Sequence, residues 1–222
     1  MRRWSSKNPK ASLMSRKRFA IVRAARQAFL EGGYAETSMD SIAKAAGVGI
    51  KTVYRHFENK DDLFSAVMQA ACNPKAFDEV TGRWKKQEKE PERVWFSKPP
   101  RGALVAAGIE YLEHVLSDEQ LALYRVVTQD AHSFPELGRR YRERVIERSH
   151  EVFAHYLTRW IPIEKWKIRD KRGAAKTFTA LLRADIFEDV LHGLREFSDS
   201  EITARARAAA VKMLILLNSG CL

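Results

Sequence analysis

The sequence predicts an all-α fold, in which an N-terminal three-helix domain precedes a larger helical bundle. Apolar residues recur at three- and four-residue steps through most of the 222-residue chain, which is the period of an amphipathic helix. Glycines, prolines and Ser, Thr or Asp residues fall between these segments, where helices end and begin. No segment alternates convincingly as a strand does, and no internal repeat is visible.

The first predicted elements are a flexible basic arm over residues 1–14 and a helix from Ser15 to Glu31. Gly32-Gly33 ends this helix, because glycine readily adopts the left-handed conformation of a helix C-cap. One apolar stripe runs along it, formed by Phe19, Val22, Ala25 and Phe29.

Two short helices follow, joined by a tight turn. Thr37-Ser38 offers an N-cap to the second helix, and Gly47 stops it. The third helix runs from about Ile50 to Phe57, and a fourth begins near Asp61-Asp62. Helix, glycine turn and helix in this order form the sequence pattern of a helix-turn-helix, whose second helix enters the major groove of DNA. By spacing alone, an ordinary three-helix bundle explains the pattern equally well.

The third helix has a buried side and an exposed side. Val53 and Phe57 lie four residues apart and can face the core. Lys51, Thr52 and Tyr54 are then left to face outward together with Arg55, and these residue types bond bases and phosphates.

The remaining sequence, after the fourth helix, predicts further helices and one segment whose structure is unclear. Residues 74–100 are either a linker or helices broken by loops, since they hold four prolines and a run of charges. Pro135 begins a long helix that reaches Trp160, and residues 161–172 form a polar loop around Pro162. The other predicted helices cover residues 102–116, a segment capped by Ser117, residues 173–195 and residues 201–218.

Positive charge is concentrated in the first third of the chain. The net charge is +11, and residues 1–70 carry 13 Lys and Arg against 6 Asp and Glu. Residues 1–18 hold seven basic residues and no acidic one, which attracts a polyanion such as nucleic acid. A solvated tail without a partner is the alternative interpretation of that arm.

Composition argues against several classes of protein. No apolar run approaches the roughly 18 residues that a membrane span needs, and no apolar segment follows the basic N-terminus as in a secretory signal. We therefore expect a cytoplasmic protein with no membrane partner. Cys72 and Cys221 lack metal-ligand spacing, so no metal or cofactor is predicted. No phosphate loop, nucleophile elbow or carboxylate pair stands out, so we do not expect an enzyme.

Six segments between residues 17 and 70 carry a resemblance to a known family: Ile21–Phe29, Gly32–Tyr34, Thr37–Ala43, Ala46–Val48, Thr52–Phe57 and Asn59–Phe64. Together they resemble the TetR family of bacterial transcriptional regulators. The resemblance implies a DNA-binding domain over residues 15–62 and a ligand-binding and dimerisation domain over residues 63–222. It also implies a sequence-specific regulator, a repressor that a small-molecule ligand releases from its operator.

The resemblance also implies roles for individual residues. Bases would be contacted by Ile50, Lys51 and Thr52, and phosphates by Thr37, Ser38, Tyr54, His56 and Lys60. The family often has Ser-Lys-Gly where this chain has Gly49-Ile50-Lys51, so the capping hydroxyl is missing here. Ile50 either meets a thymine methyl group or is buried with Val53 and Phe57.

The C-terminal part resembles the AefR-like regulators of the same family over Leu123–Val127 and Phe134–Leu137. We expect a homodimer through the last two helices, and an unidentified small molecule as ligand. The candidate residues for the wall of the ligand pocket are Tyr111, Tyr124, His132, Phe134, Tyr156, Trp160, Phe178 and Phe187. For each of them, a position in the hydrophobic core without ligand contact is the alternative. Two rival functions, a nonspecific DNA-coating protein and an enzyme on a helical bundle, share the charge or the fold.

Overall fold

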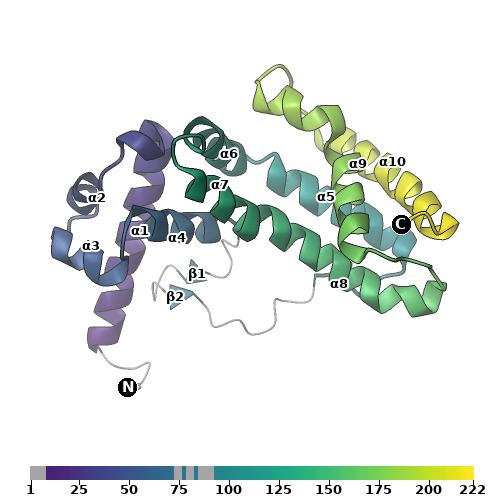
Figure 1. Cartoon of the computed structure of the whole chain (residues 1–222), viewed down its shortest axis with the longest axis horizontal. Helices are drawn as coiled ribbons and strands as arrows, with labels where there is room; N and C mark the ends of the chain where they lie inside the picture. Colours follow the sequence, from purple (N-terminus) through teal and green to yellow (C-terminus); the bar gives the residue numbers. More distant parts are fainter. Residues whose placement is uncertain (1–8, 73–76, 79–82, 85–92) are drawn as a thin grey trace. The chain divides into compact units, whose positions relative to one another are not determined.

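A computed structural model describes residues 9–72, 77–78, 83–84 and 93–222 of the chain (Figure 1). The all-α prediction is confirmed. The helices are α1 (Pro9–Glu36), α2 (Met39–Ala45), α3 (Ile50–His56), α4 (Lys60–Cys72), α5 (Pro100–Val115), α6 (Asp118–Asp130), α7 (Pro135–Tyr141), α8 (Glu147–Glu164), α9 (Lys171–Leu191) and α10 (Asp199–Ser219).

The segment that the sequence left unclear holds a very short strand pair. β1 (Phe77–Asp78) pairs antiparallel with β2 (Arg83–Trp84), with Phe77 opposite Trp84. Two residues per strand are too few to form a sheet that could stand alone. The pairing therefore leaves the fold class unchanged.

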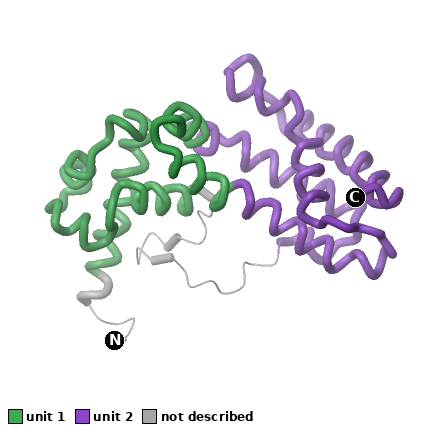
Figure 2. The backbone as a smooth tube through the Cα atoms, in the orientation of Figure 1, with its two compact units in different colours: residues 1–89, 122–145 green, residues 90–121, 146–222 purple. Residues whose placement is uncertain are grey.

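The chain divides into two compact units, shown in different colours in Figure 2. The first unit comprises residues 1–89 and 122–145, and the second comprises residues 90–121 and 146–222. In the first unit α1 packs against α2 and α4, and α4 packs against α7. The predicted boundary of the DNA-binding domain at residue 62 stays a prediction, but the first unit extends beyond it to include α4, most of α6 and α7.

Helices α5, α8, α9 and α10 form the second unit around an apolar core. At Gly108 of α5, an added Cβ would lie 2.9 Å from Leu182 of α9 and 3.1 Å from Ala206 of α10. Only glycine allows the three helices to approach so closely. The core side chains include Leu104, Leu112, Tyr156, Leu157, Phe178 and Met213.

Several helices differ from the sequence prediction; for example, the helix predicted over residues 173–195 ends at Leu191. α1 begins at Pro9 rather than Ser15, so residues 9–14 of the predicted flexible arm are helical; proline is well suited to a first helical turn. The predicted long helix from Pro135 contains a π-helical turn at Arg142–Ile146, where the chain passes from the first unit to the second. π-helical turns of this kind leave no clear trace in apolar spacing.

The predicted polar loop around residues 161–172 begins later than expected. α8 continues through Pro162 to Glu164 and ends at Lys165, which has a left-handed φ of 57°. Pro162 lacks the N–H that would bond the Thr158 carbonyl, and α8 ends within one turn of it. The C-terminal helix agrees closely with its prediction, because a Ser198 capping box starts α10 and Gly220 ends it.

Candidate nucleic-acid interface

The turn between α2 and α3 has the geometry that the glycine pattern predicted. The Ser41 N–H donates to Ser38 Oγ (3.0 Å), and the Ser38 N–H donates to Ser41 Oγ (3.1 Å), which closes a capping box at the start of α2. Gly47 has a positive φ of 64°, and nothing lies within 4 Å of the Cβ it lacks. Gly49 caps α3 without a side-chain hydrogen bond, as its missing hydroxyl implies.

α3 is anchored by a few apolar contacts and presents most of its polar side chains to solvent. Val53 is fully buried, and the adjoining Phe57 is 1% exposed. Lys51, Tyr54 and Arg55 are exposed on the other side of the helix, with Tyr54 54% exposed. Thr52 and Ile50 are half-buried. Ile50 is therefore neither fully buried with Val53 and Phe57 nor fully exposed for contact with a thymine methyl group.

Arg18 of α1 clamps the C-terminal end of α3. Its Nη1 donates to the His56 carbonyl (3.0 Å), and its guanidinium lies 4.2 Å from the centroid of the Phe57 ring. A cation at the C-terminus of a helix stabilises the helix dipole. Sequence reasoning missed this role, although Arg18 precedes Val22, Ala25 and Phe29 on the buried stripe of α1 and so was placed to face the core.

His56 is half-buried among positive charges. Burial lowers the pKa of its imidazole, and the nearby Arg18, Arg55 and Lys17 lower it further. The neutral imidazole is therefore favoured in the free protein. A phosphate next to this ring would oppose the effect of the three cations.

Thr37 belongs to the junction between α1 and α2, which we define as residues Gly33–Thr37, and the Lys60 side chain reaches this junction from the start of α4. Thr37 is buried, and the single hydrogen of its hydroxyl is shared between the carbonyls of Gly33 (2.7 Å) and Ala28 (3.1 Å). The Lys60 ammonium donates to three carbonyls of the same junction, those of Tyr34, Ala35 and Thr37. Ser38 is also bonded to the protein's own backbone, through the Ser41 N–H, but it is exposed whereas Thr37 is buried.

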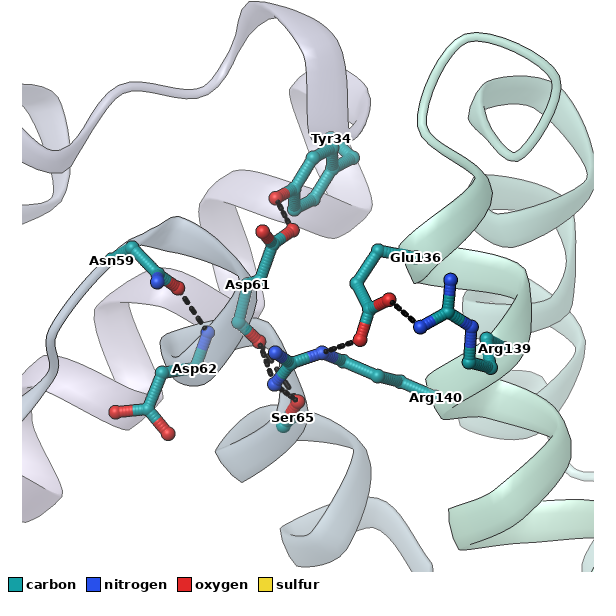
Figure 3. A network of polar contacts seen from close by, with 8 residues as sticks. All are labelled: Tyr34, Asn59, Asp61, Asp62, Ser65, Glu136, Arg139 and Arg140. Atoms are coloured by element: carbon teal, nitrogen blue, oxygen red, sulfur yellow. Dashed lines mark hydrogen bonds and ion pairs between the residues drawn. The ribbon is translucent and has the colours of Figure 1, made fainter.

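α4 is tied to both α1 and α7 by the polar contacts in Figure 3. The Tyr34 hydroxyl donates to the Asp61 carboxylate, and Arg140 Nη1 donates to Ser65 Oγ (2.7 Å) and to the Asp61 carbonyl (3.3 Å). Glu136 holds the other side of the Arg140 guanidinium at 2.9 Å. Sequence reasoning missed Arg140, because no local pattern reveals a partner 75 residues away.

Two family models match the chain. Residues 21–67 match bacterial regulatory proteins of the tetR family, and residues 102–216 match the C-terminal domain of AefR-like transcriptional repressors. The chain belongs to the TetR family. It is therefore a DNA-binding transcriptional regulator with an N-terminal helix-turn-helix, of which α3 is the second helix.

Individual relatives extend the similarity over most of the chain. The HTH-type transcriptional repressor BepR of Brucella suis is 28% identical over 191 residues, which covers 81% of this chain and 83% of BepR. A TetR-family regulator from Mesorhizobium loti has a TM-score of 0.73 at 26% identity, covering 91% of this chain and 97% of its own. The flavonoid-responsive regulator FrrA has a TM-score of 0.71 at 27% identity, with 90% and 96% covered.

The pocket candidates are divided between the two units. Tyr124, His132 and Phe134 lie in the first unit, where the Phe134 ring packs 5.2 Å from the Tyr34 ring and His132 is exposed. In the second unit lie Tyr111, Tyr156, Trp160, Phe178 and Phe187, of which Tyr156, Phe178 and Phe187 are buried.

One buried polar atom in the second unit has no partner among the described residues. It is Nε1 of Trp160, whose ring lies 6.2 Å from the Tyr156 ring. The Tyr156 hydroxyl, in contrast, donates to the Lys98 carbonyl (3.1 Å), and the Trp166 Nε1 donates to Asn218 (2.8 Å). A buried indole N–H without an acceptor is uncommon and calls for an explanation.

Within the described part of the chain, no helix is long and apolar enough to cross a membrane. No cluster of three or more His, Cys, Asp or Glu side chains able to hold a metal ion occurs there either.

Proposed function

We propose that the protein is a homodimeric repressor that places one α3 from each protomer in successive major grooves of an operator. The exposed row of Lys51, Tyr54 and Arg55 on a helix anchored from behind by Val53 carries this proposal. In this proposal Lys51 and Thr52 contact bases, and Ser38, Tyr54 and His56 contact phosphates. A single helix reads only a few base pairs, so two half-sites are needed for useful specificity.

Selection of bound duplexes from a random pool tests this function and identifies the operator. The selected duplex should be retained in excess unrelated DNA, and Lys51→Ala should weaken binding by about 5- to 150-fold, which corresponds to roughly 1–3 kcal/mol. Lys98→Met, which removes an exposed lysine of the second unit, is the matched control and should bind as the wild type does. Binding that unrelated DNA abolishes would instead indicate a protein that coats DNA without sequence preference.

The exposed face of α10 supports dimerisation through the last two helices. Ala204, Ala208, Val211 and Ile215 are exposed at steps of four, three and four residues, which aligns them along one side of the helix. Val211 and Ile215 are 58% and 62% exposed within the protomer, although both are β-branched apolar residues. A two-fold pairing of these stripes would bury them.

Sedimentation of charged variants tests the dimer. Val211→Glu and Ile215→Glu should yield monomers, because a pairing interface would bury the new charges without partners. Ile163→Glu changes a similarly exposed residue at the end of α8 and should leave the dimer intact. A Val211→Glu protein that sediments as the wild type does would exclude this face.

We also propose that a small molecule bound in the second unit releases the repressor, and that its acceptor atom bonds the Trp160 N–H. The unpartnered N–H within an aromatic cluster supports this site. FrrA is flavonoid-responsive, and a FadR from Bacillus subtilis was crystallised with stearoyl-CoA. A panel of flavonoids and stearoyl-CoA therefore provides the first probes, with thermal unfolding and operator binding as the measurements.

Two tryptophan variants form a matched pair for the ligand site. Trp160→Phe loses no hydrogen bond of the free protein, so it should keep its stability and lose the response to an active probe. Trp166→Phe removes the bond to Asn218, so it should lose about 1 kcal/mol of stability and keep the response. A Trp160→Phe protein that responds as the wild type does would place the ligand elsewhere.

A further inference from the structure

The junction Gly33–Thr37 is held from two sides by charged side chains that come from other helices. α1 is broken at Gly33, which has φ 76° and ψ 173°, so the backbone leaves its helical path there. The N–H groups of Tyr34 and Ala35 are then held by a side chain. Oδ2 of Asp130, at the end of α6, accepts both, at 2.7 Å and 3.2 Å.

The carbonyls of the same junction point to a second charged group. Lys60 Nζ, at the start of α4, lies 2.8 Å from the Tyr34 carbonyl, 3.2 Å from that of Ala35 and 3.0 Å from that of Thr37. These three bonds use all three hydrogens of the ammonium. The ammonium also lies 4.4 Å from the centroid of the Tyr34 ring, which favours a cation there.

The two charges therefore hold opposite polar groups of one short backbone segment. Asp130 is buried, and its oxygen lies 3.5 Å from the Cβ that Gly33 lacks. Burial lowers the pKa of the Lys60 ammonium, while the carboxylates of Asp61, Asp130 and Glu36 raise it. The junction leads directly into Ser38, the N-cap of α2, and α2 carries the turn to α3.

We infer that Asp130 and Lys60 are positioning residues for operator binding, which fix the direction in which α2 and α3 leave α1. Neither side chain contacts DNA. This gives the end of α6, 96 residues beyond Tyr34 in the sequence, a part in operator binding by the first unit. The inference rests on the proposed placement of α3 in the major groove.

Lys60→Met separates this role from a phosphate contact. Each phosphate contact contributes about −0.9 to the slope of log K against log salt concentration. A positioning role predicts that operator affinity falls at least about fivefold while this slope stays as in the wild type, and that affinity for unrelated DNA falls less. A slope reduced by about 0.9, with operator and unrelated DNA weakened alike, would mean that Lys60 binds phosphate and would overturn the inference.

Asp130→Ala and Asp130→Asn test the hydrogen bonds from the other side. The asparagine carbonyl oxygen can accept both N–H groups, so Asp130→Asn should bind the operator within about threefold of the wild type, whereas Asp130→Ala should lose at least about fivefold. All affinities are measured at a temperature where unfolding curves show each variant to be folded. Unchanged operator affinity in folded Asp130→Ala would reduce Asp130 to a stability role and overturn the inference.

Two further proteins keep the test decisive. If Lys60→Met does not fold, Lys60→Gln replaces it, because the amide keeps donors toward the same carbonyls while losing the charge. Lys98→Met controls for loss of one exposed positive charge. Failure of the wild type to select an operator would contradict the proposed function itself, whereas variant effects are interpreted only after wild-type binding is established.

Discussion

α3 and the junction Gly33–Thr37 are neighbours in the helix-turn-helix region, but they use their charged residues in opposite ways. Lys51 and Arg55 in α3 are exposed, and their side chains form no hydrogen bond or ion pair with the described residues. Lys60 and Asp130 at the junction are bonded to several backbone groups of the protein itself. Residue type alone therefore does not identify a DNA contact. The number of internal bonds a cation already makes is the better criterion.

The largest expected effect comes from the backbone of the junction. Gly33→Ala places a Cβ at φ 76° and ψ 173°, a region that is essentially restricted to glycine and costs about 1–3 kcal/mol for other residues. We expect the free energy of unfolding to fall by that amount in urea titrations.

The neighbouring glycine provides the control for this substitution. Gly32 has no positive φ, and an added Cβ would lie 3.7 Å from Thr37 Oγ1, an ordinary contact distance. Gly32→Ala should therefore keep or raise stability, by up to about 1 kcal/mol, because alanine favours helix more than glycine does. Equal loss in both variants would mean that Gly33 is not under special backbone constraint.

Sequence patterns predicted the backbone of this region better than its side-chain contacts. The N-cap at Ser38, the stop at Gly47 and the buried Val53 are local features, determined by residues within one or two helical turns. The bond from Tyr34 to Asp130 spans 96 residues and has no local signature. Likewise, the apolar stripes of α5, α8, α9 and α10 predicted helices, but they did not reveal which aromatic side chains would fill the core.

Arg18 joins the two regions, because it is a buried-face cation of α1 bonded to the end of α3. Arg18→Met removes the hydrogen bond to the His56 carbonyl and the contact with the Phe57 ring, and should cost about 1–2 kcal/mol of stability. Operator affinity should also fall, because the C-terminal end of α3 loses its clamp.

Two other cations show whether Arg18 acts through structure or through charge. Arg16→Met, on an exposed position of α1, and Lys51→Ala, on exposed α3, should each leave unfolding within about 0.5 kcal/mol of the wild type. Calorimetry of the three variants measures the difference. If Arg18→Met were as stable as Arg16→Met, the clamp would be energetically irrelevant and α3 would be held by its apolar contacts alone.

The smallest effect concerns His56, the one proposed phosphate contact in α3 that titrates near neutral pH. Its pKa lies below the ordinary value of 6.5 in the free protein, so the free protein should lose stability as pH falls from about 6.5 toward that lower pKa. A nearby phosphate would raise the pKa, so operator binding would take up a proton. Operator affinity should then rise over the same pH range, by less than about tenfold per pH unit because only one proton is involved per site.

The opposite directions of these two trends make His56 informative. Operator affinities of the wild type, His56→Gln and His132→Gln are compared between about pH 5.5 and 7.5 at constant ionic strength. His132 is an exposed histidine of the same unit, and its variant should retain the wild-type trend. If His56→Gln also retains that trend, the imidazole does not meet phosphate. His56 would then belong with Lys60, as a residue of the helix-turn-helix whose contacts serve the protein and not the DNA.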